Sequence, residues 1–382
     1  MIYMDNAATT RVTDEVFEAM RPCLTEVYGN PSSVHAAGRR AKKALEQARR
    51  SVAAALGADA REIYFTSGGS EADSWALFGA AYAPGNMRRT LITTRIEHKA
   101  VLNAARELER RGFTVRYLDV NAQGQVDEGE LANALSGDTF LVSVMAANNE
   151  TGAVQNIERF CAMAHEAGAL FHTDAVQAAG ARAWQLDEMG IDLFSLSGHK
   201  LHAPKGVGAL YVREGVSLSP VIFGGAQERG KRGGTENLAS AVGLGRALEI
   251  CRERLEENLS IKQALTKRLE EGILSTIEGT RVNAKTLRVP GISSITFDGV
   301  DGEALLLNLD LKGIMVSAGS ACTSGSVDPS HVLLAMGLDK KNAMSTVRFS
   351  LSEENTPQEV DEAVRVTGEI VDKLRRMKAG KL

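Results

Sequence analysis

The chain has 382 residues, a length sufficient for two domains that each bury a core. Hydrophobic residues make up 44% and charged residues 24%, and the net charge is -4, so a soluble globular protein is expected and a basic nucleic-acid-binding face is not. The four cysteines are far apart, which argues against a zinc site or a disulfide framework. No signal peptide is recognised, and no apolar run reaches the roughly 18 residues that cross a bilayer, so we expect a cytoplasmic protein without membrane contact.

Strand and helix patterns alternate along the first two thirds of the chain. Strands are predicted at 63–66, 90–94, 114–118, 139–145, 170–173, 193–197 and 208–212, and helices at 38–56, 70–82, 100–111 and 157–167. This alternation is typical of a mostly parallel sheet with helices on both faces. A long helical pattern over 236–271 follows. Strands at 292–297, 314–317 and 346–351 then alternate with helices at 302–310, 329–336 and from 357 onward, which predicts a smaller α+β domain.

Two predicted strands carry a charged side chain at their carboxyl ends. Lys200 follows the strand at 193–197, and Asp174 ends the strand that begins at 170. Ligands of parallel sheets bind beyond this edge. A lysine there can form a Schiff base with an aldehyde cofactor, and an acid can pair with the ring nitrogen of pyridoxal phosphate (PLP), with Gln177 near the ring oxygen. Taken singly, Lys200 is more often a surface lysine, and Asp174 is equally explained as a helix cap.

A glycine-rich turn, which includes Gly69 and Ser70, joins the strand at 63–66 to the next helix. Glycines allow close backbone approach to a phosphate, and a helix start offers unpaired N–H groups. Ser197 and His199 are further candidate donors to that phosphate. The absence of a Walker lysine argues against an ATP site, although any tight turn would show similar glycines.

Three more residues complete the candidate chemistry. His98, after the strand at 90–94, can stack on a pyridine ring and move protons, although a lone histidine is more often structural. Cys322 lies in a small, polar segment without apolar neighbours, where an accessible thiolate can attack a substrate atom; an incidental linker cysteine is the alternative. Arg348, among β-forming residues, suits a carboxylate site or, equally, a structural ion pair.

Taken together, these motifs resemble the cysteine desulfurases of the NifS and IscS type, within the class V aminotransferase family. The resemblance covers nearly the whole chain and rests on the order and spacing of its motifs. These are Tyr3 to Thr10, Gly29 to Ser33, Glu97-His98, Asn148 to Gly152, His172 to Gln177, Ser197 to Gly206, Gly233 to Asn237, Gly319 to Ser326 and Asp328 to His331.

The resemblance implies an α/β fold of PLP fold type I. A large PLP-binding domain would span 15–255, with a mostly parallel seven-stranded sheet, and a smaller α+β domain would comprise 1–14 and 256–382 and carry the catalytic cysteine loop. PLP is the implied cofactor and L-cysteine the implied substrate. The implied partners are a second copy of the chain, as a homodimer, and an iron–sulfur scaffold or another sulfur acceptor. No resident metal is expected, with Cys322 as a candidate transient iron–sulfur ligand.

The same resemblance assigns roles to the cofactor-site residues. Lys200 would hold PLP as a Schiff base, Asp174 would pair with its ring nitrogen, and His98 would stack on the ring. The other implied cofactor contacts are Gly69, Ser70, Asn149, Gln177, Ser197 and His199, with Thr235 reaching the phosphate of the neighbouring subunit.

The resemblance also assigns the substrate site. Asn149 and Arg348 would bind the substrate, Lys200 and His98 would act in catalysis, and Cys322 would receive the sulfur as a persulfide. A PLP aminotransferase or a selenocysteine lyase on the same fold is an open alternative, since selenocysteine shares every binding group. A non-catalytic sulfur-transfer or scaffold-binding protein is the alternative from another class, against which the intact set of Lys200, Asp174 and His98 argues.

Overall fold

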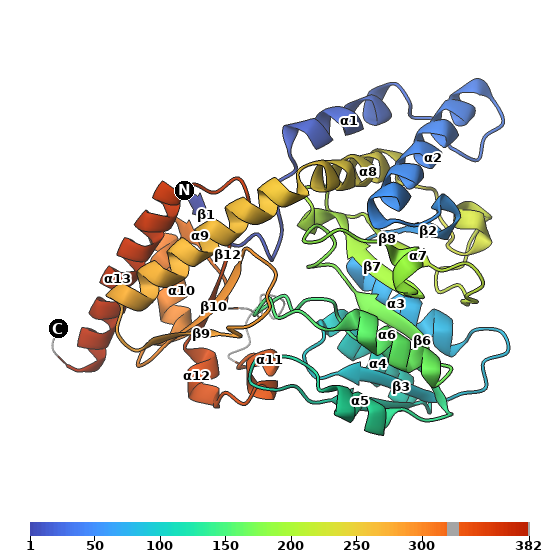
Figure 1. Ribbon diagram of the computed structural model, residues 1–382. Helices are drawn as coiled ribbons and strands as arrows, with labels where there is room; N and C mark the ends of the chain where they lie inside the picture. Colours follow the sequence, from blue (N-terminus) through green and yellow to red (C-terminus); the bar gives the residue numbers. More distant parts are fainter. Residues whose placement is uncertain (319–327, 381–382) are drawn as a thin grey trace.

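The computed structural model describes residues 1–318 and 328–380, and within them the largest sheet has seven strands (Figure 1). Its strand order is β2-β8-β7-β6-β5-β3-β4. The strands are β2 (Ile63–Thr66), β3 (Thr90–Thr94), β4 (Thr114–Leu118), β5 (Thr139–Ser143), β6 (Leu170–Asp174), β7 (Leu193–Ser197) and β8 (Gly208–Val212). Only β8 runs antiparallel to its neighbours, which confirms the predicted mostly parallel sheet.

Both faces of this sheet are covered, which explains why its strands read as continuous apolar runs. Successive side chains of one strand enter different cores: Leu193 packs with α3 (Gly69–Ala81) and α4 (Lys99–Arg110), whereas Phe194 packs in the core that includes α2 (Ala36–Leu56). Further helices of this part are α5 (Glu128–Ala134), α6 (Ile157–Glu166) and α7 (Leu186–Met189). The period-2 alternation therefore separates two apolar layers rather than core from solvent.

A second, separate core lies around a three-stranded antiparallel sheet with the order β12-β10-β9. Its elements are β9 (Thr280–Asn283), β10 (Ile292–Phe297), β12 (Thr346–Ser350), α9 (Leu255–Thr276), α10 (Gly302–Leu311) and α13 (Pro357–Lys378). At the amino terminus, β1 (Ile2–Tyr3) pairs in parallel with β11 (Ile314–Met315), and Met4 is buried in this second core. The first residues thus pack with the carboxyl-terminal part, while the domain limits at 14/15 and 255/256 stay a prediction.

The structure differs from the sequence-based expectation in the helix that joins the two parts. The pattern over 236–271 forms two helices, α8 (Leu238–Glu253) and α9, because Arg254 adopts φ −113° and ψ 20°. Each helix packs on a different core: α8 on α1 (Asp14–Thr25) and α2, and α9 on α13 (Figure 1). The break at Arg254 therefore follows from packing on two cores, which a continuous helical periodicity does not reveal.

Two further expectations differ at their ends. The strand predicted over 139–145 stops at Ser143, and the residues after it line a cavity described below. The sequence reading also left out short elements, namely α1, α5, α7, β9 and α12 (Lys340–Met344), while the helix near 329–336 forms as α11 (His331–Ala335). Within the described residues, no helix is both long enough and apolar enough to span a membrane.

Candidate active site

One cavity of about 340 Å³ lies at the carboxyl edge of the large sheet and gathers most of the candidate residues. This volume suits a small ligand or cofactor. The candidates that line it are Gly69, Ser70, His98, Asn149, Asp174, Gln177, Ser197, His199, Lys200 and Arg348. They come from strand ends, a helix start and the smaller sheet, so the fold brings together residues that are far apart in the sequence.

Asp174 supplies a buried acid at the end of β6. Its side chain is 5% exposed, and its Oδ1 accepts a hydrogen bond from the Val176 backbone N–H at 2.9 Å. Burial raises the pKa of Asp174, while nearby His98, that backbone N–H and Lys200 favour the ionised form. Such a carboxylate, shielded from water, is suited to hold a proton on a heterocyclic nitrogen.

Lys200 stands opposite, in the short 3-10 turn Gly198–Lys200 that directly follows β7. Its Nζ donates to the carbonyl oxygens of Ala7 and Ala8, the latter at 2.7 Å. Gln177 Nε2 donates to the same Ala7 oxygen at 2.9 Å. The amino-terminal segment therefore fixes both the amine and the amide, a contact that no local sequence pattern indicated.

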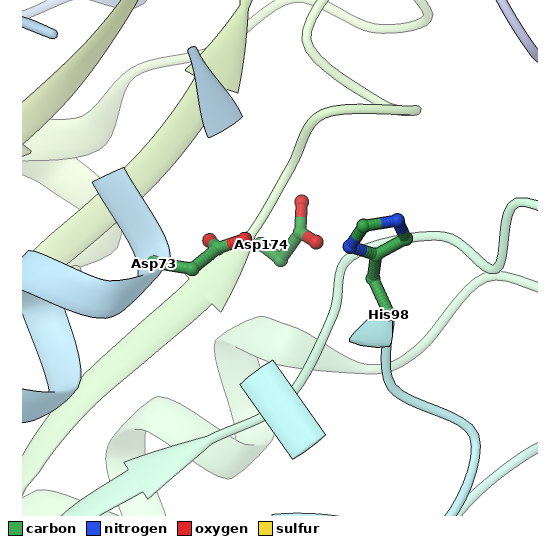
Figure 2. A group of neighbouring side chains, drawn as sticks. All are labelled: Asp73, His98 and Asp174. Atoms are coloured by element: carbon green, nitrogen blue, oxygen red, sulfur yellow. The ribbon is translucent and has the colours of Figure 1, made fainter. Parts of the chain in front are cut away.

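His98 caps the start of α4. Its Nδ1 accepts the Ala100 backbone N–H at 3.1 Å, so the neutral ring carries its proton on Nε2. Figure 2 shows the imidazole beside the carboxylate of Asp174, with Asp73 on the other side of that carboxylate. A carboxylate oxygen of Asp73, a carboxylate oxygen of Asp174 and a ring nitrogen of His98 lie within 4.8 Å of one another. His98 therefore has a structural role, as the cap of α4, and it also lines the cavity.

The start of α3 provides a candidate phosphate site. Its N-cap residue, Gly68, makes no side-chain cap hydrogen bond, so the first backbone N–H groups and the Ser70 hydroxyl remain for an anion. A Cβ on Gly69 would lie 2.8 Å from Val176 Cγ2, which shows how closely the backbone approaches the cavity wall. Ser197 lines the cavity beside this turn.

His199 adds a second donor near this end of the cavity. Burial and the nearby cations of Lys200 and Lys205 lower the pKa of His199 to about 4, so its ring is neutral at pH 7. Its Nδ1 lies 3.3 Å from Thr9 Oγ1. A bound phosphate dianion would raise the pKa of His199 again, so an anion at this position would be attracted to the histidine.

Arg348 reaches the cavity from β12 of the smaller sheet. It is 2% exposed, its Nη2 lies 2.8 Å from Asp5 Oδ1, and its Nη1 donates to the Asn149 carbonyl at 2.7 Å. Within the described residues, its buried Nε has no hydrogen-bond partner. The two alternatives for Arg348 are thus met together, because it forms an ion pair and also lines the cavity.

Two candidates are not brought to the cavity in the described part of this single chain. Thr235 is exposed and lies outside the lining residues, and Cys322 lies outside the described residues. The three described cysteines are free thiols, and burial raises the pKa of Cys161 to about 12, of Cys251 to about 11, and that of Cys23 above its ordinary value. None of these three is therefore an activated thiolate at neutral pH.

The sequence reading missed Asp73, which lies on α3 and lines the cavity at 1% exposure. Its signal was an acid at the start of a mostly apolar helical stretch from Ala72 to Ala81, since a fully buried aspartate requires a special environment. Asp5, the partner of Arg348, was quoted only as part of a motif.

The residues present fit PLP. An uncapped helix start suits its phosphate, a buried acid suits its ring nitrogen, and a lysine in the same cavity suits its aldehyde. The fold and this cavity define a PLP-dependent enzyme of fold type I.

Comparisons with known proteins agree with this class. The aminotransferase class-V family model matches residues 2–363, and the chain belongs to this family. It is 50% identical over 376 residues to cysteine desulfurase 2 of Trichormus variabilis, covering 98% of this chain and 94% of that protein. It is 48% identical over 377 residues to cysteine desulfurase IscS of Methanosarcina thermophila, covering 98% and 93%. A solved NifS-like protein aligns with a TM-score of 0.92 at 40% identity, covering 98% and 100%. The resemblance to NifS and IscS type enzymes is thereby confirmed.

Proposed function

We propose that this PLP enzyme is a cysteine desulfurase, which removes the sulfur of L-cysteine, releases L-alanine and carries the sulfur on Cys322. The full-length similarity to proteins named cysteine desulfurase supports the reaction. A further structural relative, described as SspA in complex with cysteine, aligns with a TM-score of 0.83 at 37% identity, covering 93% of this chain and 100% of that one. The observation that carries the proposal is the single cavity that joins Lys200, Asp174 and His98.

When bound, PLP supplies an electron sink that stabilises negative charge at the substrate Cα. Lys200 would hold the cofactor, and its Nζ would be the base that takes the Cα proton of the substrate. The carbonyls of Ala7 and Ala8 orient this amine. Asp174 would favour a proton on the ring nitrogen, and His98 would lie against the ring with its own proton on Nε2, a tautomer that the Ala100 contact fixes.

Arg348 and Asn149 orient the substrate through its carboxylate, which fits the guanidinium fork. The Cys322 thiolate would then attack the substrate sulfur: a sulfur–sulfur bond forms, the Cβ–S bond of the substrate breaks, and its electron pair stays with the substrate carbons. Protonation at Cβ and return of the Cα proton from Lys200 would give alanine. The persulfide on Cys322 subsequently passes its terminal sulfur to an acceptor.

The test of this function is incubation of the PLP-loaded protein with L-cysteine while alanine and Cys322-bound sulfur are measured together. Equal early amounts of both are expected. Cys322→Ser should retain the visible absorbance of bound PLP and form no persulfide, while the matched variant Cys23→Ser should behave as the parent. Formation of 3-mercaptopyruvate in place of alanine would favour transamination instead, because the sulfur then stays on the substrate carbon, and normal persulfide formation by Cys322→Ser would reject the Cys322 assignment. Lys200→Ala should lose the covalent PLP absorbance.

The homodimer is part of the proposal. Tyr28 and Val34, 77% and 89% exposed, lie on the connection between α1 and α2, and Phe223, 84% exposed, precedes the loop that borders that connection. Large apolar side chains exposed on neighbouring segments are a feature of protein interfaces, which supports a dimer contact here. Thr235 follows on the same loop and would reach the neighbouring phosphate.

The dimer can be tested by light scattering and by mixing two inactive variants. Thr235→Ala and Lys200→Ala subunits, each impaired alone, should form mixed dimers with one intact site of the two, and a monomeric protein would overturn this part. The sulfur acceptor is proposed to be an iron–sulfur scaffold or another sulfur-accepting protein in the cytoplasm. Transfer of radiolabelled sulfur from Cys322 to a purified scaffold would test it.

A further inference from the structure

Asp73 lies behind Asp174 and has no assigned part in the reaction. It is 1% exposed, it lines the cavity, and its Oδ1 has no hydrogen-bond partner within the described residues. An oxygen of Asp73, an oxygen of Asp174 and a nitrogen of His98 lie within 4.8 Å of one another (Figure 2). Two buried carboxyl groups thus lie side by side at the cavity, with Asp174 between Asp73 and His98 (Figure 2).

Among the described residues, the side chain at ion-pair distance from Asp73 is a histidine, His172, rather than a lysine or arginine. The His172 ring has Nε2 3.7 Å from Asp73 Oδ1, but burial lowers the pKa of His172 to about 3, so the ring is neutral. Its nitrogens instead contact Ser143 Oγ at 2.8 Å and Ser195 Oγ at 3.0 Å. The ionisable groups that act on Asp73 are carboxyls: Asp174 from β6 and Glu97, which follows β3.

Glu97 does not supply a charge at neutral pH either. Burial raises the pKa of Glu97 to about 8, although its Oε1 accepts the Met145 backbone N–H at 2.8 Å and the Thr94 hydroxyl at 3.0 Å. The remaining question is therefore which member of the Asp73–Asp174 pair carries the negative charge, because two buried carboxylates this close are not both ionised without a cation.

Asp174 has the better environment for that charge. The Val176 N–H, His98 and Lys200 all stabilise its ionised form, whereas the described residue that favours an ionised Asp73 is Ser195, through its hydroxyl. Burial and the neighbouring Asp174 raise the pKa of Asp73 well above its ordinary value. Geometry and charge thus agree on an asymmetric pair.

We propose that Asp73 is a positioning residue that holds a proton behind Asp174, so that the pair carries one negative charge and that charge faces the cofactor pocket. This inference rests on the proposed PLP site. Asp73 acts through Asp174: by remaining neutral it lets Asp174 stay ionised, which in turn keeps the ring nitrogen protonated. An amide in place of Asp73 would also be neutral, but it would have no carboxyl proton to lose.

The proton is tested directly by infrared spectroscopy of the PLP-free protein at pH 7, with a chelator present to exclude metal binding by the same three side chains. The spectrum should contain a carbonyl stretch of a protonated carboxyl that disappears in Asp73→Asn. It should persist in Asp174→Asn, since removal of the charged neighbour leaves Asp73 buried. Loss of the band in Asp174→Asn but not in Asp73→Asn would overturn the proposal, and so would a parent spectrum that Asp73→Asn leaves unchanged.

A second measurement follows the pH dependence of unfolding, again without PLP. Asp73 has a raised pKa in the folded state, so its proton is lost more readily from the unfolded chain, and the parent loses stability as the pH rises. Relative to Asp73→Asn, the parent unfolding constant should increase by about tenfold per pH unit above the pKa of an unfolded aspartate, until the folded pKa is passed. A difference that does not vary with pH would contradict a protonated Asp73.

The loaded enzyme provides the positioning readout. In the parent, the visible absorbance of bound PLP should change at the pH where Asp73 loses its proton, because a second negative charge then appears beside Asp174. Asp73→Asn cannot ionise and should lack this change, whereas a purely structural role would leave the same pH dependence in both proteins. If PLP does not bind the parent, the proposed function fails while the infrared result still decides the location of the proton.

Discussion

Replacement of Arg348 examines how the substrate is held. The guanidinium is buried, with Nη2 2.8 Å from Asp5 Oδ1 and Nη1 2.7 Å from the Asn149 carbonyl oxygen. It lines the cavity, and its planar fork suits a carboxylate. Arg348→Lys keeps the charge and loses the fork, whereas Arg348→Ala removes both.

The expected magnitude follows from the bonds that are lost. A hydrogen bond to a charged group contributes about 1.5–3 kcal/mol, and two such bonds join a guanidinium to a carboxylate. Water that enters the enlarged cavity offsets part of the loss, so Arg348→Ala should lower kcat/KM by about 2–4 kcal/mol, or about 30- to 1000-fold. Arg348→Lys should lose about tenfold. Because the carboxylate is bound similarly in the ground state and the transition state, KM should change more than kcat.

The assay is alanine formation over a range of L-cysteine concentrations, with apoprotein unfolding measured in parallel to separate folding defects from binding defects. Asp5→Asn is the matched control, since it breaks the same ion pair but leaves the arginine in the cavity. A KM defect in Asp5→Asn as large as that in Arg348→Ala would show that the ion pair, not the carboxylate, matters. An unchanged KM in Arg348→Ala would refute the assignment.

Two further predictions concern stability. Arg49 and Glu228 form a buried, doubly hydrogen-bonded ion pair at 2.7 and 2.8 Å, so Arg49→Ala should destabilise the protein by about 3–5 kcal/mol in urea unfolding, whereas exposed Arg50→Ala should have little effect. An equal effect of both would contradict this. His172 has a pKa lowered to about 3 by burial, so the unfolded state binds a proton that the folded state does not. The free energy of unfolding should therefore fall by about 2 kcal/mol from pH 6.5 to 5, and this slope should be smaller in His172→Gln; equal slopes would refute it.

The large sheet was predictable because inner strands such as β5, β7 and β8 are short, fully buried runs rich in apolar residues, and burial on both faces makes that signal local. The joint between α8 and α9 was not, because both segments are helical and only their packing on separate cores breaks them at Arg254. Short elements such as α12 were left out for a related reason: five residues carry too little periodicity.

Within the candidate site, too, the residues with a local sequence pattern were predictable and the long-range contacts were not. Asp174 and Lys200 were found because a charged residue at the end of an apolar strand is a local pattern. The contacts that orient them were not, because Ala7 is 193 residues from Lys200 and Asp5 is 343 residues from Arg348 in the sequence. Backbone carbonyls such as that of Ala7 have no side-chain signature at all.

Asp73 shows why the charge of a site is not read from its residue types. Counted as written in the sequence, the acids Asp5, Asp73 and Asp174 would outnumber the cations Lys200 and Arg348 around the cavity. Such a site would repel both the phosphate of PLP and the carboxylate of an amino acid. With a proton on Asp73 the charges of the cofactor-free site balance, and the dipole of α3 then favours the incoming anion. The burial of one carboxyl group, visible only in three dimensions, thus decides whether the cavity accepts an anionic ligand.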